Sequence, residues 1–253
     1  MIFRRTLLAG LLMACATEPA MPDQRVFELR NYLLHPGRRD DLIDLFEREF
    51  VESQEALGAC IVGTFRNLDD PDRFVWIRSF ADFPSRYAAL DGFYSGPVWQ
   101  THRAAANATM IDAHNVLLLR PHAGALHCDS ATRPPIGASA IPHSVITATT
   151  YFLAPGGEED FALFFTDVLA PRVRSAGGDV LATFVSEHRA NNYPRLPVRG
   201  NVNVFVAIAR FASTAEQTEG ARALGALGRD IERRVVQPTE TLRLQPTARS
   251  LPR

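Results

Sequence analysis

Two charged residues, Glu28 and Arg30, occupy alternate positions of a run, residues 25–34, whose residue types favour a strand. Alternate residues of a strand share one face of the sheet, so these side chains point the same way. A later predicted strand carries Trp76 and Arg78 in the same alternation. Buried mixed charges beside an aromatic wall suit the recognition of carboxylate or carbonyl oxygens by guanidinium groups. The pattern therefore predicts a site for a small anionic or carbonyl-bearing molecule.

A second group of polar and aromatic residues lies in a predicted helix that begins near Pro97. Trp99, His102 and Arg103 fall on neighbouring positions of one side of that helix. His102 is the candidate acid or base, because an imidazole titrates near neutral pH, although such a histidine also serves as a hydrogen-bonded helix contact. The predicted substrate-binding residues are Glu28, Arg30, Arg66, Trp76, Arg78, Trp99 and Arg103.

Familiar catalytic and cofactor motifs are missing from the sequence. It contains no G-x-S-x-G, Walker loop, dinucleotide fingerprint or H-E-x-x-H. His122, His127 and Cys128 are close in sequence, but they form neither a CxxC pair nor a helical pattern with a carboxylate. We therefore predict no metal and no cofactor. Cys60 opens an apolar strand and is interpreted as an inert core thiol.

The predicted elements of the first half alternate between strand and helix. Strands are expected at residues 25–34, 61–66, 73–80 and 115–120, and helices at 39–57 and 82–110, the second interrupted at Gly96 and Pro97. The first helix has apolar residues at steps of three and four positions, which predicts an apolar face. They are Leu42, Leu45, Phe46 and Phe50.

The same order of elements repeats in the second half. Residues 32–37 read YLLHPG and residues 151–156 read YFLAPG, each followed by an acidic, Phe-rich helical run. The corresponding elements are residues 145–153, 158–176, 180–188, 202–211, 215–235 and 241–245. We predict an α+β fold of tandem ferredoxin-like units forming a pseudo-dimeric α+β barrel. The domains are residues 25–121 and 143–246, with a signal-like segment at 1–24, a linker at 122–142 and a tail at 247–253.

The repeat also predicts which residues face each other. We expect Phe27 and Leu29 to face the helices, which places Glu28 and Arg30 in the barrel interior. Aligning the halves places Thr147 and Thr149 opposite Glu28 and Arg30, and Ala207 and Ala209 opposite Trp76 and Arg78. A structural brace would be expected in both halves, so the asymmetry favours a site in the first half. The alternative is an ion-pair network that only holds the barrel together.

Composition excludes some classes of partner. The net charge is −1, no lysine is present, and no basic stripe is interleaved with aromatic residues, so nucleic-acid binding is not expected. No stretch approaches the roughly 20 apolar residues of a membrane span. A small-molecule ligand and a homo-oligomer remain as partners, and contact with a membrane is expected only through a lipid anchor.

The N-terminal segment resembles an export signal. Arg4 and Arg5 precede a short apolar run, and residues 12–15 read LMAC, which has the form of a lipobox. These features predict lipidation at Cys15 and a location in the cell envelope or periplasm. The alternative is a cytoplasmic protein whose true start is Met21.

Three runs resemble the NIPSNAP domain, namely VFELRNYLLHPG, GTFRNLDDPDRFVWIRSF and GFYSGPVWQTHRAAANATMIDAHNVLLLRP. The resemblance covers residues 25 to about 121, whereas the second half lacks the GPVW and DDPDRFVW signatures. It implies a ferredoxin-like, dimeric α+β barrel fold. It implies no reaction, because most bacterial members have none assigned and the eukaryotic relatives are linked to vesicle traffic and mitophagy signalling. Fold relatives include monooxygenases, decarboxylases and small-molecule binders, which is an analogy only.

The leading prediction is a NIPSNAP protein that binds a small anionic or carbonyl-bearing molecule in the first-half barrel cleft, with catalysis left open. The alternative is a non-enzymatic interaction or scaffold protein with a packed barrel. A filled interior beside Glu28, Arg30, Trp76 and Arg78 would favour the scaffold.

Overall fold

The described part of the chain comprises residues 23–124 and 126–253 of a computed structural model. The predicted lipidation site Cys15 and the alternative start Met21 lie outside the described residues. Within the described residues, no helix is both long and apolar enough to span a membrane.

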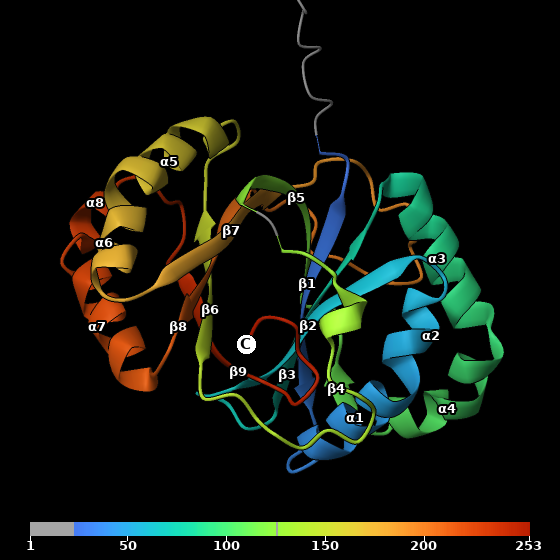
Figure 1. Cartoon of the computed structure of the whole chain (residues 1–253). Coiled ribbons are helices and arrows are strands. Elements are labelled where there is room, and N and C mark those ends of the chain that lie inside the picture. The colour runs from blue at the N-terminus through green and yellow to red at the C-terminus, as the bar shows by residue number, and fades with distance from the viewer. Residues whose placement is uncertain (1–22, 125) are drawn as a thin grey trace, which may run out of the picture.

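Eight antiparallel strands of the described residues close into a barrel (Figure 1). The first unit supplies β1 (Val26–Leu34), β2 (Ala59–Asn67), β3 (Arg73–Phe80) and β5 (Val116–Gly124), and the second supplies β6 (Val145–Phe152), β7 (Asp179–Ser186), β8 (Val204–Phe211) and β9 (Glu240–Pro246). The order β3-β2-β9-β6-β8-β7-β5-β1 closes through the β3–β1 pair, and the short β4 (Met110–Asp112) adds to β1. The units meet at β2–β9 and β5–β7. The predicted α+β barrel is thus confirmed.

Helices cover the outside of the barrel on its two opposite sides, one set from each unit (Figure 1). The first set is α1 (Arg39–Leu45), the π-helical turn η1 (Phe46–Phe50), α2 (Val51–Glu55), α3 (Phe83–Ser95) and α4 (Pro97–Asn107). The second set is α5 (Glu158–Phe164), the π-helical turn η3 (Phe165–Leu169), α6 (Ala170–Ser175), α7 (Thr214–Gly225) and α8 (Gly228–Glu232). Each π turn begins at the same sequence distance after Tyr32 or Tyr151, which supports the internal repeat.

Side-chain caps set the start of the helix that follows the third strand in each unit. The Asp82 carboxylate accepts from the Ser85 amide at 2.7 Å before α3, and the Ser213 hydroxyl accepts from the Glu216 amide at 3.2 Å before α7. Such caps satisfy amides that have no partner within the helix. Pro97 occupies the first position of α4, where its missing amide hydrogen is tolerated.

The barrel interior is filled by apolar side chains from both units. Phe27, Leu29, Val75 and Ile77 belong to this core, together with Ile146 and other residues of the second unit. The prediction that Phe27 and Leu29 face the helices, with Glu28 and Arg30 inside the barrel, is therefore wrong. The barrel interior is surrounded by sheet on all sides, so charges there would find few partners, whereas the helices on the outer face can supply polar partners.

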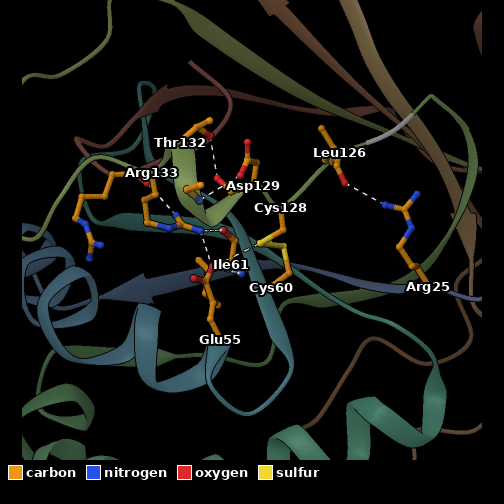
Figure 2. Close-up of a disulfide and its surroundings, with 11 residues drawn as sticks. Arg25, Glu55, Cys60, Ile61, Leu126, Cys128, Asp129, Thr132 and Arg133 are labelled. Atoms are coloured by element: carbon orange, nitrogen blue, oxygen red, sulfur yellow. Dashed lines mark hydrogen bonds and ion pairs between the residues drawn. A yellow bond between two sulfur atoms is a disulfide. The ribbon is translucent and has the colours of Figure 1, made fainter.

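The linker between the units is attached to the first unit by a disulfide (Figure 2). Cys60 of β2 is bonded to Cys128, with a Cα–Cα distance of 5.8 Å. The nearby Arg133 donates to the Glu55 carboxylate and to the Ile61 carbonyl, both at 2.6 Å. The interpretation of Cys60 as an inert core thiol is therefore wrong, because Cys60 forms a disulfide. The sequence did not reveal the pairing, since Cys128 lies in a segment without periodicity.

The C-terminal residues after β9 continue along β2. The Thr247 amide donates to the Thr64 carbonyl at 2.9 Å, and the Leu251 amide donates to the Val62 carbonyl at 3.3 Å. Thr247 and Ser250 are fully buried. The tail that follows β9 is thus packed against the first unit.

Candidate functional site

Glu28 lies at the centre of a buried cluster between the outer face of the sheet and the helices of the first unit. Its carboxylate accepts from Arg30 Nη1 at 2.6 Å, from Arg78 Nε at 2.8 Å and from Arg86 Nε at 2.8 Å. All four side chains are at most 1% exposed. The strand register places Glu28 directly opposite Arg78 and places Arg30 opposite Trp76. The structure therefore brings together four of the predicted site residues and adds a third arginine.

Each arginine also has a polar partner other than Glu28. Arg30 Nε donates to the Tyr32 hydroxyl at 2.8 Å, Arg78 Nη1 donates to Gln54 Oε1 at 2.8 Å, and Arg86 Nη1 donates to Asn191 Oδ1 at 3.0 Å and to Asn192 Oδ1 at 2.5 Å. Arg86 was missed in the sequence because a single arginine in a helix is normally solvated. Asn191 and Asn192, in the loop after β7, gave no signal either.

The cluster carries three positive charges and one negative charge, an excess of two, beneath the helices. Burial by itself would raise the pKa of Glu28, but the combined attraction of Arg78, Arg30 and Arg86 holds its pKa well below the usual range. Burial also acts against the charge of Arg86 and lowers its pKa. Glu28 is therefore the one group that compensates these buried cations in the cluster.

Aromatic residues complete the packing around the cluster. The guanidinium carbons of Arg30 and Arg78 lie 5.4 and 4.9 Å from the Trp76 ring centroid. None of five cavities identified among residues 23–124 and 126–253 is lined by Glu28, Arg30, Trp76 or Arg78. The arrangement fits a structural brace. A ligand-binding role for these residues is untested and stays a prediction.

The remaining predicted residues lie elsewhere on the first unit. Arg66 pairs with Asp40 at 2.9 Å. Trp99 packs on Phe50, Phe93 and Tyr94.

His102 and Arg103 lie on α4. His102 Nε2 is 3.6 Å from Glu49 Oε2, and the histidine ring packs on Phe50. Arg103 is exposed. The contacts of His102 fit helix packing, and its role as an acid or base stays a prediction.

The depressed pKa of Glu28 predicts a pH dependence of stability. An unfolded glutamate titrates near 4.3. The stabilisation from ionised Glu28 should be complete above that value and should be lost as pH falls towards the folded-state pKa. We therefore expect the difference in unfolding free energy between wild type and Glu28→Gln to be constant from about pH 8 to 5 and to shrink below about pH 4. Urea unfolding at several pH values measures it; a constant difference down to pH 2.5 would contradict the assignment.

The corresponding space in the second unit is open. The β6–β8 register pairs Thr147 with Ala209 and Thr149 with Ala207, at the positions that Glu28, Arg78, Arg30 and Trp76 occupy in the first unit. Small side chains there leave a cavity of about 270 Å³ between the sheet and α7. Its lining is mostly apolar and comprises Thr147, Thr149, Tyr151, Phe165, Val173, Ala207, Ala209, Phe211, Gln217, Gly220, Ala221, Leu224, Thr241 and Arg243.

A second cavity of about 510 Å³ adjoins the first beneath α7 and α8. The two share Thr149, Tyr151, Leu224 and Thr241 in their linings. Together they form what we call the second-unit pocket. Volumes of this size are typical of small-molecule sites, which usually combine an apolar lining with a few polar groups.

The polar groups of the second-unit pocket come from β6, β9 and α7. Thr241 Oγ1 donates to Thr149 Oγ1 at 3.3 Å. Arg243 Nε donates to Gln217 Oε1 at 2.8 Å, and Arg243 Nη1 is 2.8 Å from Asp69 Oδ1. The sequence signal for this pocket was the asymmetry between the halves, but it pointed to the half with the polar residues and not to the half with the small ones.

Burial shapes the chemistry of Tyr151, which lines both parts of the pocket. Its side chain is 2% exposed, and burial raises the pKa of its hydroxyl. The group therefore stays protonated across the physiological pH range and acts as a hydrogen-bond donor.

Comparison with known proteins agrees with this fold. Three solved structures cover most of the chain: a proposed monooxygenase from Fusobacterium nucleatum (8% identity, TM-score 0.56, 90% of this chain and 94% of that one), another from Lactobacillus acidophilus (12%, 0.55, 90% and 97%) and an anthrone oxidase-like protein (12%, 0.60, 89% and 92%). At these identities the likeness is one of fold. No curated protein matches the sequence. The NIPSNAP family model matches residues 27–124. The chain therefore contains a NIPSNAP domain, which forms the first half of an eight-stranded α+β barrel.

Proposed function

We propose that the protein binds a small molecule in the second-unit pocket, between the outer face of the barrel and helices α7 and α8. The observation that carries the proposal is the exchange of large for small residues at matched strand positions. Trp76 and Arg78 fill the first unit, whereas Ala207 and Ala209 leave a cavity in the second. This moves the predicted ligand from the first half to the second.

The proposal gives the two units different roles, since the first stabilises the barrel and the second binds the ligand. The first unit, closed around Glu28, gives the barrel a rigid half, and its core cannot accommodate a ligand without breaking buried ion pairs. The second unit keeps the space free. The two proposed monooxygenases and the anthrone oxidase-like protein share only the fold with this chain. The likeness therefore does not decide whether the bound molecule is also a substrate.

Filling the pocket is expected to abolish ligand binding. Ala207→Phe places a ring in the cavity at the position that Trp76 occupies in the first unit. A thermal-shift screen of metabolites on the wild type should yield compounds that stabilise it by roughly 2.7 kcal/mol at a hundred times their dissociation constant. The same compounds should not stabilise Ala207→Phe.

The matched control is Ala105→Phe, which adds the same ring at an exposed position of α4 and should respond to every compound as the wild type does. Compounds that stabilise Ala207→Phe and wild type equally would place their site elsewhere. A complete screen without any stabilising compound would favour the scaffold alternative, in which the packed barrel serves only for interactions.

We also propose that the chain folds in an oxidising compartment such as the periplasm. The lipobox-like sequence before Cys15 and the pairing of Cys60 with Cys128 support the same location independently. Disulfides persist in oxidising compartments and are rare in the cytosol.

A further inference from the structure

We infer that the second-unit pocket selects a neutral, largely apolar molecule with an uncharged acceptor oxygen, such as a ketone, and that the Tyr151 hydroxyl donates to that oxygen. This rests on the proposed function, because it specifies the ligand of the same pocket. It is carried by the hydrogen-bonding state of two buried side chains and by the charges of the lining.

Tyr151 supplies a donor without a protein partner. In the described part of the chain, its hydroxyl makes no hydrogen bond, although the residue is 98% buried and lines both cavities. Its first-unit counterpart, Tyr32, accepts from Arg30. A hydroxyl that belongs to a cavity lining and makes no hydrogen bond to the protein is available to donate to a ligand oxygen.

Gln217 supplies a second donor to the 270 Å³ cavity, the part of the pocket between the sheet and α7. The side chain is 3% exposed, and its Oε1 accepts from Arg243 Nε at 2.8 Å. This bond fixes the orientation of the amide, so the free end of Gln217 is the Nε2 group. Within the described residues, the hydrogen bond of this amide to the protein is the one at Oε1, which leaves Nε2 available to a ligand. Both polar side chains therefore offer hydrogens and call for acceptor atoms on the ligand.

The charges of the lining disfavour an anion. Among the described residues, Arg243 is the only charged one that lines the 270 Å³ cavity, and its Nη1 already lies 2.8 Å from the Asp69 carboxylate. A carboxylate enclosed there would be a buried charge without an uncommitted cation, which is costly. A neutral carbonyl accepts the same hydrogen bonds without that cost.

The rest of the lining favours a flat hydrocarbon body. Phe165 of the π-helical turn η3 and Phe211 of β8 line the cavity, and Ala207 and Ala209 of β8 add small side chains to the lining. Apolar contact of this kind gains stabilisation in proportion to the area removed from water. The ligand class is therefore an aromatic or alicyclic ketone, or a similar uncharged carbonyl compound.

Three naphthalene probes separate these features in the full chain. 2-Acetylnaphthalene carries the ketone, 2-ethylnaphthalene has the same ring and similar size without oxygen, and 2-naphthoate is the anion. We expect the ketone to bind about 2- to 12-fold more tightly than the hydrocarbon, the range of one net hydrogen bond, and the anion to bind most weakly. Dissociation constants are measured by the change in probe fluorescence.

Tyr151→Phe removes the hydroxyl and keeps the ring contacts with Phe161 and Phe205. In this variant the ketone and the hydrocarbon should bind equally. The matched control is Tyr193→Phe, which also removes a tyrosine hydroxyl that has no hydrogen-bond partner within the described residues, but one that does not line the pocket. That variant should keep the preference for the ketone.

Three results would overturn the inference: tightest binding of 2-naphthoate, an unchanged ketone preference in Tyr151→Phe, or no saturable binding of 2-acetylnaphthalene. If one of these occurs while the metabolite screen finds compounds that Ala207→Phe excludes, the ligand class is wrong and the pocket stands. If the screen finds no such compound, the proposed function itself fails.

Discussion

Replacing Glu28 with glutamine is expected to lower the free energy of unfolding by about 3 to 5 kcal/mol, the cost of leaving buried charges without their partner. The substitution keeps the size of the side chain and removes the one negative charge that Arg30, Arg78 and Arg86 share. Three cations would then lie together away from water. Denaturant unfolding monitored by tryptophan fluorescence and circular dichroism measures the loss.

Arg78→Met is the control for this prediction. It removes one cation and leaves Glu28 paired with Arg30 and Arg86, so the carboxylate is never left alone. We expect Arg78→Met to lower the free energy of unfolding by less than Glu28→Gln does. In the double variant the loss should be smaller than the sum of the two single losses. Equal losses with additive effects would show that the charges do not act as one network.

Removing the disulfide with Cys60→Ser and Cys128→Ser is expected to lower the free energy of unfolding by about 4 kcal/mol. The bond joins residues separated by 68 positions, and the entropy that a crosslink removes from the unfolded chain grows with the size of the closed loop. The denaturant m-value should rise, because the unfolded chain without the crosslink exposes more surface.

Wild type treated with a reductant is the control and should match the double serine variant. Thiol alkylation of protein isolated from its native cells, without prior reduction, tests the compartment at the same time. Quantitative alkylation of Cys60 and Cys128 would contradict both the disulfide in the cell and an oxidising location.

Local sequence patterns were sufficient to predict most of the elements and the duplication, although the short strand β4 was not predicted. The YxLxPG motifs, the helix break at Gly96 and Pro97 and the apolar spacing of 39–57 each depend on residues close in the chain. The alignment of Thr147 with Glu28 and of Ala209 with Arg78 agrees with the strand register. Such agreement is possible because strand alternation and helical periodicity are local properties of the backbone.

The direction in which the faces point could not be predicted from alternation. A strand has two faces, and the sequence shows that Glu28 and Arg30 share one of them without showing which face is covered by helices. We assigned the apolar face to the helices, whereas Phe27 and Leu29 fill the barrel. The reason is that a closed barrel surrounds its interior with sheet, so polar partners such as Gln54 and Arg86 can come only from the helical side.

The sequence by itself determined the order of the elements, the two-unit barrel and the difference in side-chain size between the halves. Only the tertiary structure decided which half is closed by its side chains and which half keeps a pocket. Charged residues in the first unit meet long-range partners, among them Asn191 across the unit boundary, and close the space. Small residues in the second unit meet a helix that does not fill the gap above them, which leaves the pocket. Cavities and buried pairings depend on residues far apart in the chain, because only close packing of the whole fold fixes which atoms touch.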